Sequence, residues 1–99
     1  MPYYIFLINW TDEGIRNVKD SPKRAAAARA ALEKVGGKWH GLYYTFGQYD
    51  MVLIAEAPND EAIMSVTLAV GSAGSVRTTT LKAFPESEAA KIIEKLPAK

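Results

Sequence analysis

Four runs of apolar residues, separated by short polar segments, predict four strands. They span residues 3–10, 39–46, 51–57 and 76–84 and are rich in Tyr, Val, Ile and Thr, the residue types that favour strands. Residues 12–35, residues 60–70 and the segment that opens at Pro85 space their apolar side chains as helices do. The pattern therefore predicts the order β-α-β-β-α-β, followed by a C-terminal helix.

The segment from Tyr43 to Ile54 predicts a β-hairpin around which the other elements are arranged. Strand-forming residues flank the stretch 47–50 (Gly-Gln-Tyr-Asp), and its glycine supplies the backbone freedom that a tight reversal requires. Pro58 ends the third strand, and Asn59 or Asp60 is expected to cap the helix that follows. The hairpin places the second and third strands side by side and antiparallel.

The first helical segment is expected to be interrupted. Thr11 is a favourable N-cap, but Pro22 cannot lie inside an unbroken helix, because it lacks an N–H and its ring clashes with the preceding turn. Ser21 followed by Pro22 suggests a fresh cap and helix start, so we expect a jog near Asp20 and a longer helix to about Val35. The apolar residues on one side of this longer helix are mostly small, which predicts that the helix lies close to the sheet.

Short connections and right-handed crossovers fold this order into an α+β, ferredoxin-like sandwich with both main helices on one sheet face. The other face is then bare. Because residues 3–10 are apolar on both sides, we expect Tyr4, Phe6 and Ile8 to face outward there and a second copy of the chain to cover them. This predicts a homodimer or a higher oligomer. The polar alternation of residues 76–84 predicts an edge strand.

The composition narrows the class of protein. A chain of 99 residues predicts one domain, residues 1–99, with a modest core. Twelve basic residues against eleven acidic ones argue against nucleic acid as a partner. The lack of cysteine excludes disulfides and thiolate metal sites, and no apolar run reaches membrane-spanning length. We expect a cytoplasmic protein without a metal, a cofactor or a membrane partner.

Several segments resemble the GYD family of small bacterial proteins. The resemblance rests on the Gly-x-Tyr-Asp step at residues 47–50 and on the stretches 8–11 (Ile-Asn-Trp-Thr), 14–24 and 76–81. That family belongs to the dimeric α/β-barrel group and has no settled function, so the resemblance implies this fold and a homodimer without implying a reaction. Other members of the group include cofactor-independent monooxygenases, haem-degrading enzymes, isomerases and ligand-sensing domains, which is an analogy of fold alone.

Three residues are candidates for acid–base catalysis. Asp50, beside Tyr49 at the mouth of a strand, could orient a ligand or act as a base. In the simpler interpretation, Asp50 has a structural role and accepts hydrogen bonds from backbone N–H groups across the hairpin. His40, the sole histidine, could transfer protons at neutral pH or be an ordinary strand residue. Without a second histidine at ligand spacing, it does not predict a metal site.

Two groups of residues could bind a ligand. A basic group on the interrupted helix could hold a carboxylate or phosphate, or could be a solvated face; it comprises Arg16, Lys23 and Arg24, which Arg77 could join. An aromatic group could wall a pocket between sheet and helices for a planar molecule, or could be core and dimer interface. It comprises Trp10 and Tyr43, with Asn9, Trp39, Tyr44 and Phe46.

Three functions therefore stay open. The first is a homodimer that binds a small anionic or aromatic molecule. The second is a cofactor-independent monooxygenase or isomerase that uses Asp50, His40 or a tyrosine, and the third is a pure interaction module without a pocket. Polar groups that converge inside an enclosed cavity would distinguish the second from the first, and any cavity would argue against the third.

Overall fold

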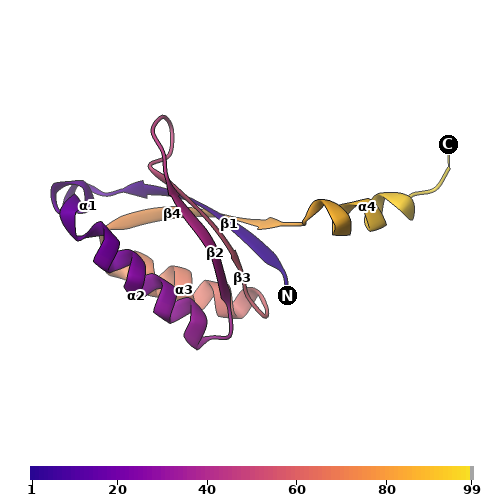
Figure 1. Ribbon diagram of the computed structural model, residues 1–99, viewed down its shortest axis with the longest axis horizontal. Helices are drawn as coiled ribbons and strands as arrows, with labels where there is room; N and C mark the ends of the chain where they lie inside the picture. Colours follow the sequence, from indigo (N-terminus) through magenta and orange to yellow (C-terminus); the bar gives the residue numbers. More distant parts are fainter. Residues whose placement is uncertain (99) are drawn as a thin grey trace.

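The computed structural model describes residues 1–98, and its elements follow the predicted order (Figure 1). They are β1 (Tyr3–Trp10), α1 (Asp12–Arg16), the 3₁₀ helix η1 (Val18–Asp20), α2 (Ser21–Lys34), β2 (Lys38–Tyr44), β3 (Met51–Glu56), α3 (Asp60–Ser72), β4 (Val76–Ala83) and α4 (Glu86–Glu94). The strands lie in the order β2-β3-β1-β4, each antiparallel to its neighbours, with α2 and α3 on one face. The predicted α+β, ferredoxin-like fold and the edge position of β4 are confirmed.

The predicted interruption of the first helix is confirmed. Thr11 caps α1 by accepting the N–H of Gly14 at 3.1 Å, α1 ends at Arg16, and η1 leads into α2. The predicted cap at Ser21 is wrong, because Asp20 occupies the cap position and makes no side-chain cap bond. The Ser21 hydroxyl hydrogen-bonds instead to the Tyr44 hydroxyl on the sheet, at 2.7 Å.

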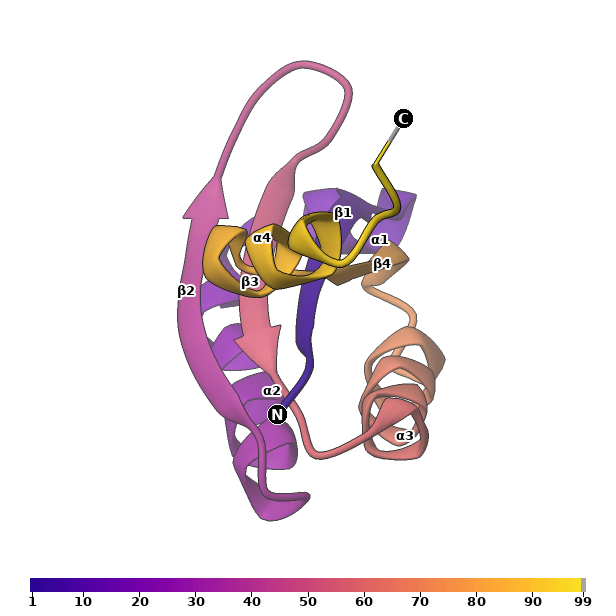
Figure 2. The same cartoon turned by 90° about the vertical axis from the view of Figure 1, so that its right-hand side faces the viewer.

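The hairpin between β2 and β3 is also confirmed. Gly47 has a φ of 110°, a conformation that glycine adopts without strain, and the N–H of Thr45 donates to the carbonyl of Asp50 at 2.8 Å. β2 ends two residues earlier than predicted, and Phe46 is 99% exposed in the loop. Figures 1 and 2 show this loop extending beyond the sheet, so Phe46 contributes nothing to the core.

A bulge in β2 changes which of its side chains share a face. The register against β3 shifts between Trp39 and Gly41. The extra residue reverses the alternation, so Trp39 and Leu42 face the helices together, and His40 shares the opposite face with Tyr43. The predicted faces of this strand, with Trp39 and Tyr43 together, are therefore wrong, because a strict period of two cannot represent a bulge.

The core lies between the sheet and the two helices. Tyr4, Phe6 and Ile8 point into it and are only 3–8% exposed, where they pack with Leu53 of β3 and Leu32 of α2. The expectation that these three residues of β1 face outward is wrong. The sequence pattern divides β1 into two apolar faces, and the handedness of the crossover from β1 through the helix determines which face the helices cover.

The opposite side, which we call the open face, is uncovered in the described chain. Its central rows are apolar: Ile5 pairs with Ile54 and Leu81, and Leu7 pairs with Val52 and Thr79. These side chains are only partly buried, and Leu81 is 44% exposed. No described helix lies over this face (Figure 1). The sandwich therefore has an unpaired apolar layer, although its members differ from those predicted.

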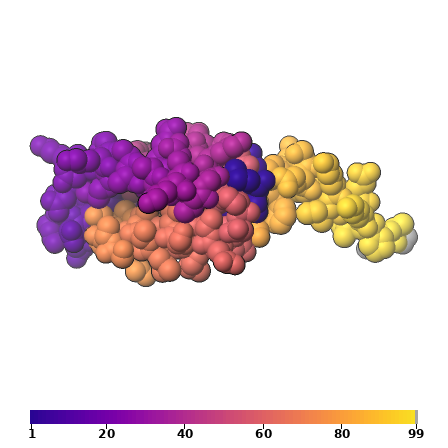
Figure 3. All heavy atoms as spheres, turned by 90° about the horizontal axis from the view of Figure 1, so that it is seen from below, coloured from indigo at the N-terminus to yellow at the C-terminus, as the bar shows by residue number. Residues whose placement is uncertain are grey.

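The C-terminal helix α4 projects from the end of β4 and away from the rest of the molecule (Figures 1 and 3). Pro85 opens it, as predicted. Its apolar residues Ile92 and Ile93, together with Phe84 and Leu96 beside the helix, are all more than half exposed. α4 makes no substantial contact with another element of residues 1–98.

Candidate functional site

A cavity of about 270 Å³ lies between the sheet and helices α2 and α3. Its walls are mainly apolar side chains from β1, β2, β3 and both helices, including Phe6, Trp39, Leu42, Met51, Val66 and Val70. On α2 the lining consists largely of alanines, among them Ala25 and Ala28. The small side chains of α2, which we expected to bring the helix close to the sheet, thus leave a space between the helix and the sheet. The volume is near the lower end of the range for small-molecule sites.

One end of this cavity, which we call the Trp10 end, carries most of its polar groups. The indole of Trp10 lines the cavity, and its Nε1 is buried without a hydrogen-bond partner in the described chain. Its ring centroid lies 6.3 Å from that of Tyr44, whose hydroxyl bonds to buried Ser21. Arg24, one turn further along α2, also lines the cavity. The α2 residues Ser21 and Arg24 therefore bring hydrogen-bonding groups to the end of the cavity that Trp10 borders.

Gly14 holds the Trp10 end together. The Nη1 of Arg24 donates to the carbonyl of Asn17 at 3.0 Å, and its Nη2 donates to that of Gly14 at 3.2 Å. A side chain at position 14 would collide with the backbone, because a Cβ there would lie 1.9 Å from the carbonyl oxygen of Ser75 and 3.1 Å from Cδ1 of Trp10. Glycine therefore lets α1 pack directly against the indole and the start of β4.

Asp50 lies outside the cavity. One of its carboxylate oxygens accepts the backbone N–H of Trp10 at 2.9 Å, and its own N–H donates to Ile8 at 2.9 Å. The carboxylate thus ties the start of β3 to the end of β1, whereas the sequence suggested partners within the hairpin. Tyr49 is partly buried and its carbonyl accepts the Thr45 hydroxyl at 2.6 Å. Both residues have structural contacts near the Trp10 end, and neither lines the cavity.

His40 lies on the open face. Its Nε2 is 2.6 Å from a carboxylate oxygen of Glu56, and its ring stacks on Tyr3 with centroids 5.2 Å apart. The hydrogen bond to His40 lowers the pKa of the Glu56 carboxyl below its usual value, and nearby Lys38 acts in the same direction. The sheet separates this cluster from the cavity, so the three acid–base candidates do not converge on one enclosed site.

The ligand-binding candidates divide between two sides of the molecule. Trp10 and Arg24 line the cavity. Asn9 and Arg77 are paired across β1 and β4 on the open face, which they share with Tyr43. Arg16 and Lys23 are exposed on α1 and α2. Arg77 therefore cannot join Arg24, because the sheet lies between them. The residues absent from the sequence-based candidates are Ser21 and the alanines of α2, whose role becomes visible only once the layers are assembled.

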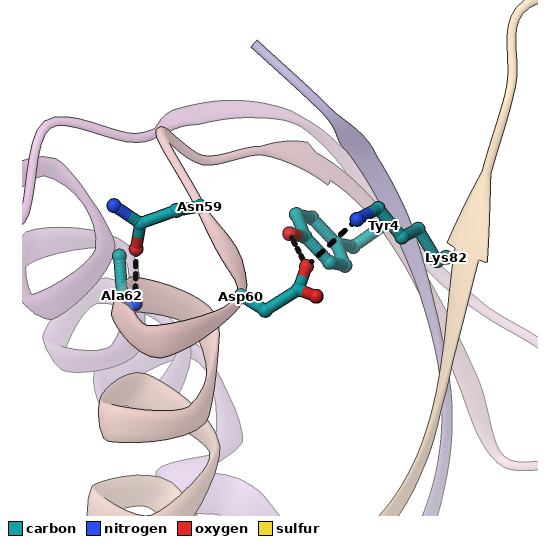
Figure 4. A network of polar contacts seen from close by, with 5 residues as sticks. All are labelled: Tyr4, Asn59, Asp60, Ala62 and Lys82. Atoms are coloured by element: carbon teal, nitrogen blue, oxygen red, sulfur yellow. Dashed lines mark hydrogen bonds and ion pairs between the residues drawn. The ribbon is translucent and has the colours of Figure 1, made fainter.

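A second polar cluster fastens α3 to the sheet (Figure 4). The Tyr4 hydroxyl donates to Asp60 at 2.5 Å, and the ammonium of Lys82 lies 3.1 Å from the same carboxylate oxygen. Burial, aided by the hydrogen bond to Asp60, raises the pKa of Tyr4 to about 12. The same bond and Lys82 lower the pKa of Asp60. Asn59 caps α3 by accepting the N–H of Ala62 at 2.9 Å, which confirms the predicted cap.

Comparisons with known proteins agree with this architecture. The crystal structure of MtbAldR superposes with a TM-score of 0.66 at 15% identity, over 86% of this chain and 54% of that protein, so the chain spans about half its length. A crystal structure of a protein from Thermus thermophilus gives a TM-score of 0.53 at 23% identity, over 86% of this chain and 95% of that one. At these identities the likeness concerns the fold alone. None of the helices within residues 1–98 is long and apolar enough to cross a membrane.

Sequence comparison defines the family. A relative from Thermus thermophilus named "Glutamine synthetase and cystathionine beta-lyase binding protein" is 33% identical over 89 residues, which are 89% of this chain and 94% of the relative. The family model for the GYD domain matches residues 4–93, nearly the whole chain and including the Gly-Gln-Tyr-Asp step of the hairpin loop. The chain therefore belongs to the GYD domain family.

Proposed function

We propose that this protein is a homodimeric binding module whose two copies pair through their open faces and whose cavities each hold one small apolar molecule. The observation that carries the proposal is the cavity between the sheet and helices α2 and α3. Small-molecule sites are concave and lined mainly by apolar side chains, and this cavity, which is partly open to solvent, has that form.

The open face supports the dimer. Its rows of apolar side chains from β1, β3 and β4 form a contiguous patch, which soluble monomers rarely leave in water. A two-fold axis would bring the same patch of a second copy against it, and each copy would then bury the face that its own helices do not cover. Cytoplasmic localisation, for which a chain without cysteine is suited, is part of the same proposal.

The lining favours binding over catalysis. The described residues that border the cavity supply hydroxyl, indole and guanidinium groups, and none of them is an aspartate, glutamate or histidine. A cofactor-independent monooxygenase or isomerase needs a general base in reach of its substrate. Asp50 and His40 are both directed elsewhere. We therefore place a small-molecule binder ahead of the enzymatic alternative.

Binding to another protein is the second candidate function. The Thermus thermophilus relative is named for binding two enzymes. In the present chain α4 offers exposed apolar side chains at Ile92 and Ile93, and Phe46 is fully exposed in the hairpin loop. A surface of this kind fits a protein partner, which the small-molecule site in the cavity could regulate.

The cavity is tested by filling it. Ala28→Leu places a larger side chain in the lining, whereas Ala26→Leu makes the same change on the exposed side of α2. We expect the wild-type protein and Ala26→Leu to bind the naphthalene probes 1-naphthoate or 1-naphthamide in calorimetry, and Ala28→Leu to bind about tenfold more weakly or not at all. The absence of binding of both probes to the wild type at millimolar concentration, or equal binding by the two variants, would refute the site.

A further inference from the structure

We propose that the cavity selects an apolar molecule that carries one carboxylate, such as an aryl or alkyl carboxylic acid, and binds this carboxylate at the Trp10 end. The inference rests on the proposed function, because it specifies the ligand of the same cavity. Three observations support it: the apolar walls, the hydroxyl pair at Ser21, and Arg24, the single charged residue among the described lining residues.

The walls away from the Trp10 end determine the body of the ligand. Side chains such as Phe6, Leu53 and Val66 offer no hydrogen-bonding atoms there. The hydroxyl of Thr67, one of the polar residues along α3, is already committed to the carbonyl of Ile63 at 2.8 Å. A polar group placed against these walls would lose its hydration without a replacement, so this part of the ligand must be hydrocarbon.

The hydroxyl of Ser21 offers a hydrogen-bond donor. It lies 2.7 Å from the Tyr44 hydroxyl, and either group can donate in this bond. When Tyr44 donates, the proton of Ser21 is free to turn toward a third group. Ser21 is buried and lines the cavity, so an acceptor at the Trp10 end can use this proton.

Arg24 supplies the charge that favours a carboxylate over a neutral carbonyl. It is the only charged residue among the described lining residues, and its hydrogen-bond partners, Asn17 and Gly14, offer neutral backbone carbonyls. A carboxylate near this guanidinium gains a charge-assisted interaction. A ligand cation would meet the same positive charge, and the described lining offers it no carboxylate or amide side chain. An α-amino acid is therefore disfavoured against a simple acid.

The experiment compares three naphthalene probes of similar shape on the full chain: 1-naphthoate, 1-naphthamide and 1-methylnaphthalene. We expect calorimetry and tryptophan fluorescence to show the acid binding at least about tenfold more tightly than the amide, and the amide more tightly than the hydrocarbon. Higher salt should narrow only the difference between acid and amide. This ranking uses the wild-type protein, so it does not depend on any variant folding.

Two variants separate the contributions. Arg24→Gln should bring the affinities for acid and amide to within about twofold of each other, whereas Arg29→Gln, an exposed arginine on the same helix that pairs with Glu33, should leave the preference intact. Ser21→Ala should weaken the acid and the amide but not the hydrocarbon, because only the first two accept a hydrogen bond from the Ser21 hydroxyl. Equal affinity of the wild type for acid and amide would overturn this inference and leave the proposed site standing. If no probe bound, the proposed function itself would fail.

Discussion

The two faces of the sheet are built from similar residues and end in different environments. On β1, Tyr4, Phe6 and Ile8 are covered by helices of their own chain, while Ile5 and Leu7, one step away, remain partly open on the other side. Both sets are apolar, so hydrophobicity alone does not distinguish a core from an interface. The difference comes from topology: helices α2 and α3 cover one face, and no described helix covers the other.

The largest effect is expected from placing a charge on each face in turn. Leu7→Glu puts a carboxylate in the middle of the open face, where pairing of two copies would bury two like charges, so we expect a folded monomer in place of the dimer. Light scattering after size-exclusion chromatography gives the mass, and circular dichroism gives the fold.

The matched variant is Phe6→Glu on the covered face. Phe6 is 4% exposed, so a carboxylate there has neither water nor a partner, and we expect the chain to unfold. A wild-type protein that already has the mass of one chain at micromolar concentration would contradict the pairing of open faces. A folded Phe6→Glu would contradict the assignment of the core.

A smaller effect is expected at Asp50, whose carboxylate ties the start of β3 to the end of β1. Asp50→Ala removes the acceptor of the Trp10 backbone N–H, so the free energy of unfolding should fall by about 1 to 3 kcal/mol. Asp50→Asn keeps an acceptor oxygen and should lose about 1 kcal/mol. Thermal unfolding of the three proteins measures the order. If Asp50→Ala melted at or above the wild-type temperature, the Asp50 carboxylate would not stabilise the fold. A functional role for Asp50 would then be the better interpretation.

The smallest effect concerns the dependence of stability on pH and involves one carboxylate on each face of the sheet. The folded-state pKa of Asp60, on the helix side, and of Glu56, on the open face, are both lowered. A lowered pKa stabilises the fold above the unfolded-state value, and this contribution disappears as the pH falls through the folded-state value. We therefore expect the melting temperature to fall below about pH 4, and Asp60→Asn to have a shallower acid loss than wild type.

A control identifies the responsible carboxylate. Glu33 is exposed and pairs with Arg29, one turn earlier in α2, so Glu33→Gln should follow the wild-type curve. For Tyr4 the sign is the reverse. Its raised pKa, about 12, means that its contribution is complete below the unfolded-state value of 10.0 and is lost only in strong alkali. An acid profile unaltered by Asp60→Asn would show that the cluster in Figure 4 does not govern this transition.

Much of the fold could be predicted because local signals agree with the tertiary structure. Pro22 broke the first helix where expected, and Gly47 marked the hairpin. The bulge between Trp39 and Gly41 leaves no mark in the apolar pattern, but a glycine inside a strand often marks a bulge, and Gly41 is the signal that could have indicated it. The orientation of β1 could not be predicted, because its two faces are equally apolar.

The candidate site was harder to predict than the fold. Trp10 and Arg24 were identified by residue type and position, and the structure places both at the cavity. The grouping of Arg77 with Arg24 is wrong because the sequence does not show on which face of the sheet Arg77 lies. Ser21 was assigned to a helix cap, since its partner Tyr44 lies 23 residues away. The cavity itself results from small side chains on α2, and the same alanines would equally suit a tightly packed interface.

The isolation of α4 has a consequence for how stable this helix is in water. A helix of nine residues without substantial tertiary contacts is marginal in water, because the unfavourable nucleation of its first turn is compensated by very few hydrogen bonds. The proposed protein partner would shift the helix–coil equilibrium of residues 86–94 if it received Ile92 and Ile93. The far-ultraviolet ellipticity of the chain would then increase in helical character on binding that partner.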